Sequence, residues 1–150
     1  MRLGSWLSAA LAVLVSACEK PSEPPVVRAS FGVFFGGEVQ ERKELPLVLD
    51  RTRQAHGIRL DFRDPPERPL RVTWEVEKPA GAKNDDGGRV TDYGETRTRV
   101  GEARIEIPLA FRATDRPGAW HVRVSVAERV VLDRAFEVIV PGPAPRAVED

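Results

Sequence analysis

The chain has 150 residues, with 23 basic side chains, 23 acidic side chains and a single cysteine. Its length fits one domain, and its balanced charge gives no support for nucleic-acid binding, which calls for a basic surface. The single cysteine excludes an intrachain disulfide, so the fold must rest on packing alone.

The N-terminal segment is organised like a secretory signal peptide. Arg2 and the amino terminus supply positive charge, and residues 6–17 are twelve consecutive uncharged residues. A membrane-spanning helix needs roughly 20 apolar residues, whereas a run of this length fits the apolar core of a signal peptide. We therefore predict that residues 1–17 are a signal peptide that is removed.

The sequence Val15-Ser16-Ala17-Cys18 resembles the lipobox of bacterial lipoproteins, in which an aliphatic residue and two small residues precede a cysteine. The resemblance implies cleavage before Cys18 and attachment of a diacylglycerol to its sulfur, which anchors the protein in a membrane. Residue 19 is Glu rather than the Asp that commonly retains proteobacterial lipoproteins in the inner membrane, so the outer membrane is favoured. An ordinary secretory signal with an incidental cysteine is the alternative.

Two proline-rich segments flank the rest of the chain. Residues 19–25 hold three prolines and three charged residues, a composition that favours an extended spacer, so residues 18–25 form the predicted tether. Residues 141–150 begin Pro-Gly-Pro-Ala-Pro and are predicted to be a disordered tail. The predicted domain is residues 26–140.

Hydrophobic and other residues alternate through most of this domain, which is typical of half-buried β-strands. Turn-forming residues such as Gly36-Gly37 separate the alternating runs. The pattern predicts an all-β fold, an antiparallel β-sandwich of about seven or eight strands. Pro108 lies inside one run and is expected at a sheet edge or a bulge. The alternating runs are 27–35, 45–49, 58–62, 70–76, 103–111, 120–126 and 130–140.

The last two runs resemble the terminal hairpin of immunoglobulin-like and fibronectin-III-like bacterial domains. Residues 117–124 are Pro-Gly-Ala-Trp-His-Val-Arg-Val, and the closing run contains Phe136-Glu137-Val138. In those domains a Pro-Gly-x-aromatic-x-Val-x-Val strand pairs with a strand that ends in Phe-x-Val. The resemblance implies an immunoglobulin-like sandwich and no particular activity.

Residues that carry catalysis are sparse, so no catalytic site, cofactor or metal site is expected. His56 and His121 are expected to face solvent, because a zinc site needs three or four ligands and these two are scattered. Ser125 lies on a predicted solvent-facing surface and outside any Gly-x-Ser-x-Gly motif. We therefore predict a protein that is not an enzyme.

Acidic residues offer no better site. Asp61 and Asp64 make a weak candidate for a catalytic pair, because one lies on a strand and the other opens a turn. Residues 84–88 are Asn-Asp-Asp-Gly-Gly, which could attract calcium but lack the alternate spacing of known calcium loops. The turn preferences of these residues favour a wide hairpin loop.

The aromatic residues divide between core and surface. Trp74 and Trp120 have inward parity and are expected to be core anchors rather than a ligand platform. Phe34 has the opposite parity from Phe31 and Phe35, so it either packs against a second layer or is exposed. The candidate contact surface, an exposed apolar group around a glycine turn, comprises Phe34, Gly36, Gly37 and Val39.

A polar segment precedes the run that starts at residue 103. Arg97 and Arg99, with Glu95 and Glu102, are expected to protect a sheet edge against aggregation. A polar docking edge is the alternative.

Together these features predict an anchored, non-enzymatic envelope lipoprotein that contacts another envelope protein or a surface polymer. A structural or assembly subunit of an envelope or secretion complex is the alternative, and an enzyme ranks lowest.

Overall fold

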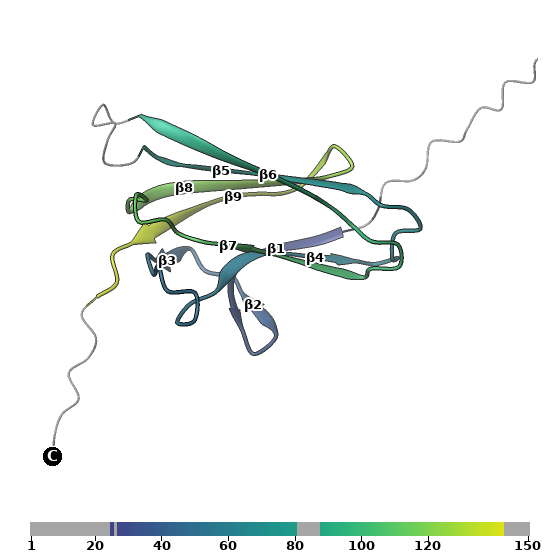
Figure 1. Ribbon diagram of the computed structural model, residues 1–150, viewed down its shortest axis with the longest axis horizontal. Coiled ribbons are helices and arrows are strands. Elements are labelled where there is room, and N and C mark those ends of the chain that lie inside the picture. Colours follow the sequence, from purple (N-terminus) through teal and green to yellow (C-terminus); the bar gives the residue numbers. More distant parts are fainter. Residues whose placement is uncertain (1–24, 26, 81–87, 143–150) are drawn as a thin grey trace, which may run out of the picture.

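The computed structural model describes residues 25, 27–80 and 88–142, which form a β-sandwich of two facing sheets (Figure 1). These residues form no helix, so none of them supplies a helical membrane span. The all-β prediction is confirmed. The strands of the described residues are β1 (Val27–Phe35), β2 (Glu38–Gln40), β3 (Glu44–Pro46), β4 (His56–Phe62), β5 (Arg71–Pro79), β6 (Arg89–Arg97), β7 (Arg104–Leu109), β8 (Gly118–Val126) and β9 (Arg129–Ile139).

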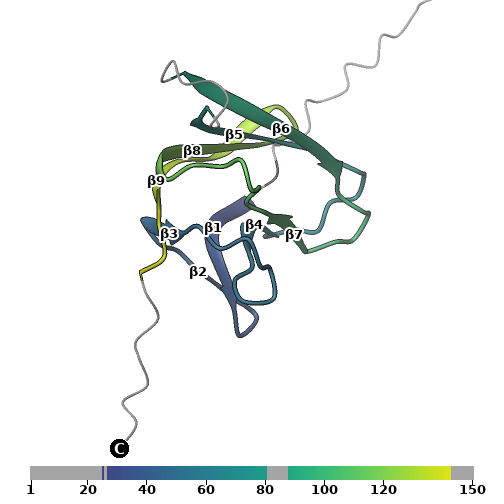
Figure 2. The ribbon, with the colours of Figure 1, turned by 60° about the vertical axis from the view of Figure 1, so that its left-hand side comes forward.

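The four-stranded sheet has the order β2-β1-β4-β7, and the five-stranded sheet has the order β3-β9-β8-β5-β6. Neighbouring strands are antiparallel except β3 and β9, which run parallel. The two sheets form separate layers in both views (Figure 1, Figure 2). The predicted antiparallel sandwich is therefore confirmed, with one parallel pair at its edge that the sequence did not predict.

The core lies between the sheets and uses the alternate residues that the sequence assigns to the inward face. Phe31, Ile58 and Leu60 of the four-stranded sheet are fully buried, and so are Val122 and Val124 of the five-stranded sheet. Burying one side chain of this size contributes about 1.5–3 kcal/mol. Strands with one buried face thus supply the packing that a disulfide-free domain requires.

The predicted alternation fails where strands extend past the opposing sheet. Phe35, Leu49 and Val140 have inward parity but are 69%, 51% and 68% exposed. Phe35 ends β1, Val140 follows the end of β9, and Leu49 lies beyond the three-residue strand β3. Inward parity buries a side chain only where the other sheet covers it.

A β-bulge changes the parity of β9. The register between β8 and β9 shifts at Val124 and Ser125, which pair with Leu132 and Val130 respectively. Val130 is predicted to face inward but is 52% exposed, whereas Val131 packs against the core. Val131 is the extra residue of β9, and an extra residue gives the side chains on its two sides opposite parities.

The edge strands β6 and β7 carry residues that are suited to a sheet edge. The edge strand β6 is not among the predicted runs, because its inward positions include Asp92 and Gly94 rather than a row of large apolar residues. Its Glu95 accepts a hydrogen bond from Arg71 at 2.8 Å, which agrees with the predicted polar edge. Pro108 lies on β7, the edge strand of the other sheet, as predicted.

The predicted anchor lies outside the described residues. These exclude Cys18, the signal peptide 1–17 and the tether up to residue 24. They also exclude residues 84–87 of the predicted hairpin loop and residues 143–150 of the predicted tail. The strands on either side of the loop, β5 and β6, are antiparallel neighbours.

Candidate functional site

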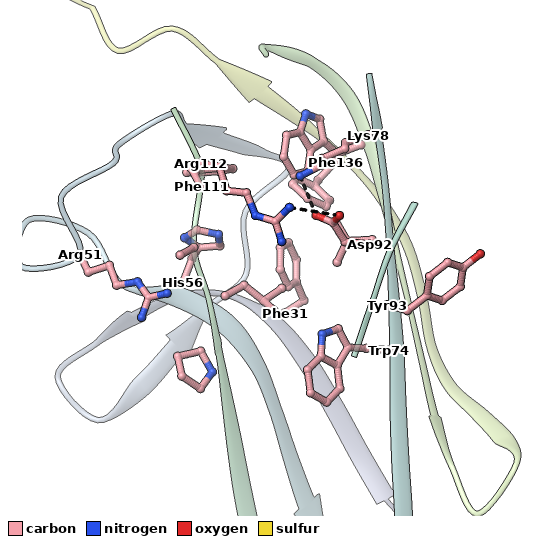
Figure 3. Close-up of a pocket in the computed structure, with 15 residues that line it drawn as sticks. Phe31, Arg51, His56, Trp74, Lys78, Asp92, Tyr93, Phe111, Arg112 and Phe136 are labelled. Carbon is pink, nitrogen blue, oxygen red and sulfur yellow. Dashed lines mark hydrogen bonds and ion pairs between the residues drawn. The ribbon is translucent and has the colours of Figure 1, made fainter. Parts of the chain in front are cut away.

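A cavity of about 460 Å³ opens between the sheets, near the start of β4 and the end of β7. Sites for small molecules typically have volumes of about 300–1,000 Å³ and combine apolar walls with a few polar groups. This cavity has both kinds of lining (Figure 3). The aromatic residues that line it are Phe31, Trp74, Tyr93, Phe111, Trp120 and Phe136, and the polar residues are Arg51, His56, Lys78, Asp92 and Arg112.

The aromatic wall is a connected set of rings from both sheets. The ring centroids of Phe31 and Phe136 are 4.7 Å apart, and Trp120 meets Phe136 at 6.0 Å. Phe111 packs edge-on against Trp120 at 5.5 Å. Such tilted and edge-to-face pairs are the favoured aromatic geometries, so the wall is fixed by the same contacts that form the core.

The two tryptophans have different roles in this wall. Trp120 is 5% exposed, which confirms its prediction as a core anchor, and its Nε1 donates a hydrogen bond to the backbone oxygen of Arg116 at 3.1 Å. Trp74 packs against the core but is only partly buried. Its indole lies over Gly94, the residue opposite it on β6. Trp74 therefore presents part of its ring to the cavity.

His56 is buried, so the prediction that it faces solvent is wrong. It is 5% exposed, because it opens β4 with inward parity and stacks on Phe111 with ring centroids 4.4 Å apart. Burial lowers the pKa of the His56 imidazole to about 4, helped by the Arg51 guanidinium and opposed by the Asp115 carboxylate. The ring is therefore neutral at pH 7.

The nitrogen atoms of His56 are open to the cavity. The ring makes no hydrogen bond to any group among the described residues. Every fully buried side-chain nitrogen in these residues has a partner, so the ring nitrogens of His56 are not fully buried. Because His56 lines the cavity, they are accessible from it. A neutral imidazole there offers one hydrogen-bond donor and one acceptor.

Lys78 is a buried cation that the sequence analysis missed. It continues the inward parity of β5, and its side chain is 8% exposed. Its Nζ lies 2.6 Å from Asp92 and 2.7 Å from Asp115, and 5.4 Å from the centroid of the Trp120 ring. Two carboxylates thus satisfy the charge that burial would otherwise penalise. The inward position of Lys78 after three alternate apolar residues was the available signal.

The rim of the cavity carries two arginines. Arg112, which follows β7, pairs with Asp92 of β6 at 3.5 Å and so joins the two sheets across the opening. Arg51, from the connection between β3 and β4, is exposed and makes no ion pair within the described part of the chain. In Figure 3 the His56 ring lies between the guanidinium groups of Arg51 and Arg112. The cavity therefore has an aromatic interior and, at its rim, the Arg51 guanidinium, whose charge no carboxylate among the described residues neutralises.

The predicted contact surface lies elsewhere, on the hairpin of β1 and β2. Phe34 and Val39 are cross-strand partners and both are half-buried. Gly36 and Gly37 form the exposed turn with φ angles of 59° and 78°, which L side chains rarely adopt. The structure brings these four residues together. Phe34 is not fully exposed, because its ring lies over Gly57 on β4.

A buried arginine holds this hairpin against the sheet. Arg59 of β4 points to the outer face but is 3% exposed. Its Nη2 donates hydrogen bonds to the Gly37 oxygen at 2.7 Å and to Glu106 at 2.6 Å. The sequence pattern assigned Arg59 to the polar face and gave no sign of its burial, which depends on the folding of β2 over it.

The other residues considered for chemistry are dispersed. His121 faces outward and contacts Asp133. Asp61 pairs with Arg104 at 2.6 Å and is not joined to Asp64. Within the described ranges, no three His, Cys, Asp or Glu side chains form a group that could hold a metal ion.

Comparison with known proteins identifies the fold and no family. No protein-family model matches the chain, and no curated protein is significantly similar to it. An immunoglobulin-like protein from Pseudomonas aeruginosa is similar in structure, with a TM-score of 0.50 and 22% sequence identity over 76% of this chain and 97% of that one.

A second structure, the alkylpurine DNA glycosylase AlkC from Pseudomonas fluorescens bound to DNA, shares 15% identity at a TM-score of 0.40. The match covers 75% of this chain and 30% of the glycosylase. The first likeness agrees with the strand arrangement described above. The chain therefore has an immunoglobulin-like fold.

Proposed function

We propose that this chain is a lipid-anchored, non-enzymatic binding module of the cell envelope. The lipobox-like sequence ending at Cys18 carries the anchoring part of the proposal. The interlayer cavity and the β1–β2 hairpin are the surfaces available for binding. The outer membrane is the favoured location, because Glu19 follows the cysteine.

The spacing between the cysteine and the domain supports this proposal. β1 begins at Val27, so eight residues separate it from Cys18, and three of them are prolines. A proline-rich spacer of this length extends about 3.1 Å per residue. Two or more acyl chains on Cys18 would hold the protein stably at a membrane, with the sandwich close to the surface but separate from it.

The anchor is tested by replacing the cysteine. The native host is grown with radiolabelled palmitate while it expresses the wild type, Cys18→Ser or the control Ser22→Ala. We expect label in the wild type and the control, and no label in Cys18→Ser, which should also keep its larger precursor mass. If Cys18→Ser carries label, or if the wild type carries none, the anchoring proposal is wrong.

The β1–β2 hairpin is the proposed contact surface for an envelope protein or a surface polymer. Phe35, 69% exposed, adds apolar area at the glycine turn, on the opposite face of the hairpin from Phe34 and Val39. A Phe35→Ser variant removes exposed apolar area and leaves the buried contacts of Phe34 in place. We expect it to lose a partner that co-purifies with the wild type from crosslinked envelopes.

A matched variant at the opposite end of the fold controls this experiment. Val130→Ser also removes an exposed apolar side chain, 52% exposed beside the β8–β9 turn. The proposal expects Val130→Ser to retain the partner. Equal retention by both variants would show that the hairpin is not the contact surface. Co-purification with subunits of one complex at fixed stoichiometry would favour the assembly-subunit alternative.

A further inference from the structure

We propose that the cavity between the sheets binds a small carboxylate with a planar ring, the ring lying against the aromatic wall and the carboxylate reaching His56 and Arg51. This inference rests on the binding part of the proposed function and is independent of the anchor. Nothing in the immunoglobulin-like fold requires such a cavity, because a sandwich core is ordinarily filled by side chains.

The position of the His56 ring is the first argument. The residue is 5% exposed and its ring is held against Phe111, while its nitrogens make no hydrogen bond to the described residues and are accessible from the cavity that His56 lines. The ring thus presents free hydrogen-bonding atoms, at a fixed position, to the inside of the cavity. An N–H of this ring is well placed to donate to a ligand oxygen.

Charge is the second argument. Lys78 is held by Asp92 and Asp115, and Arg112 shares Asp92. Arg51 is therefore the cation at this cavity without a carboxylate partner in the described ranges. Its planar guanidinium suits bidentate binding of a carboxylate. The same excess of positive charge disfavours a cationic ligand.

Shape is the third argument. The wall is formed by Phe111, Trp120 and Phe136, whose rings are fixed by contacts with one another. Trp74 closes the side next to β6. Rigid aromatic faces bind a planar apolar group at little entropic cost. The volume of about 460 Å³ accommodates a ligand of one or two fused rings.

Three matched probes test the proposal on the purified full mature protein in detergent micelles. They are 2-naphthoate, 2-naphthalenemethanol and 2-naphthylmethylammonium, which share one ring system and differ in charge. Binding is measured by equilibrium dialysis at pH 7, with micelles alone as the blank. We expect 2-naphthoate to bind about tenfold more tightly than the alcohol, because a charge-assisted hydrogen bond is lost, and the amine to bind most weakly.

Two arginine variants locate the site. Arg51→Gln should weaken binding of 2-naphthoate about tenfold and leave binding of the alcohol unchanged. Arg53→Gln, in the same exposed connection but away from the cavity lining, should leave both unchanged. Both side chains are exposed, so neither change should affect folding.

Equal binding of the three probes, tightest binding of the amine, or no binding of any probe overturns the proposal. So does an equal effect of the two arginine variants. None of these outcomes bears on acylation of Cys18, which palmitate labelling measures separately. A labelled protein that binds no naphthoate would therefore retain the anchor and lose only the carboxylate site.

Discussion

The imidazole of His56 stacks on the ring of Phe111, with centroids 4.4 Å apart and an interplanar angle of 27°. This contact keeps a titratable group in an aromatic environment that disfavours its charged form. It therefore links the pH of the solution to the stability of the fold.

Acidification should destabilise the protein through His56. The pKa of this residue is lowered from 6.5 to about 4 in the folded chain, so the unfolded chain binds the proton first as pH falls. His56 imposes no penalty above pH 6.5, and its penalty grows between pH 6.5 and 4 to about 3 kcal/mol. Urea titration at several pH values measures this loss.

The control for this prediction keeps the stacked ring and removes the titration. His56→Phe should have a shallower decline of unfolding free energy between pH 6.5 and 4 than the wild type. An equal slope in the wild type and His56→Phe would show that His56 is not buried in the neutral form.

Truncation of the central tryptophan should strongly destabilise the sandwich. Trp120 is 5% exposed and contacts Phe111 and Phe136, so Trp120→Ala should cost about 3–5 kcal/mol through lost burial and a cavity. Tyr93→Ala, at a residue that is 75% exposed, should cost far less. Denaturant unfolding compares the two, and a near-zero loss for Trp120→Ala would contradict the assigned face of β8.

Addition of a methyl group at Gly94 should displace Trp74. A Cβ at this glycine would lie 2.1 Å from the indole, so the ring must move. Gly94→Ala should destabilise by about 1–3 kcal/mol, as overpacking does. Combining Gly94→Ala with Trp74→Leu should cost less than the sum of the single changes, because the shorter side chain avoids the clash. Strict additivity in this double-mutant cycle would refute the contact.

The turn between β8 and β9 should accept a stabilising change. Ala127 and Glu128 have φ angles of 47° and 67°, the left-handed region that two-residue hairpins fill with Asn-Gly. Non-glycine residues pay about 1–2 kcal/mol there. Ala127→Asn with Glu128→Gly should therefore stabilise by roughly 1–2 kcal/mol and raise the thermal midpoint. Glu128→Ala alone, which keeps a Cβ at this position, should give no such gain.

The sequence predicted the sandwich because strands with one buried face have a simple period. The alternation of Trp120, Val122 and Val124 matches their burial, and turn residues marked the breaks. β6 was not predicted because an edge strand needs few large apolar residues. The parity change in β9 comes from a bulge, which has no clear signature in an alternating sequence.

The cavity could not be predicted from the same pattern. His56 and Lys78 are polar residues at strand ends, where parity alone does not decide burial. Their environment depends on residues distant in sequence, Phe111 stacking on one and Asp115 pairing with the other. Such a site is formed by tertiary contacts, and the alternation of hydrophobic residues along one strand does not predict which distant residues will be in contact.

The register of β1 with β4 places His56, and the cavity that it lines, away from the point where the chain enters the domain. Val27, where the chain enters the domain, pairs with Phe62, whereas Val33 pairs with His56. Val27 and Val33 are six positions apart along the strand, a distance of about 20 Å. In a molecule tethered through Cys18, the bilayer would lie nearer the Val27 end, and the cavity beside His56 would lie at the end of the strands farther from it. A dissolved molecule could then enter without first crossing the lipid headgroups.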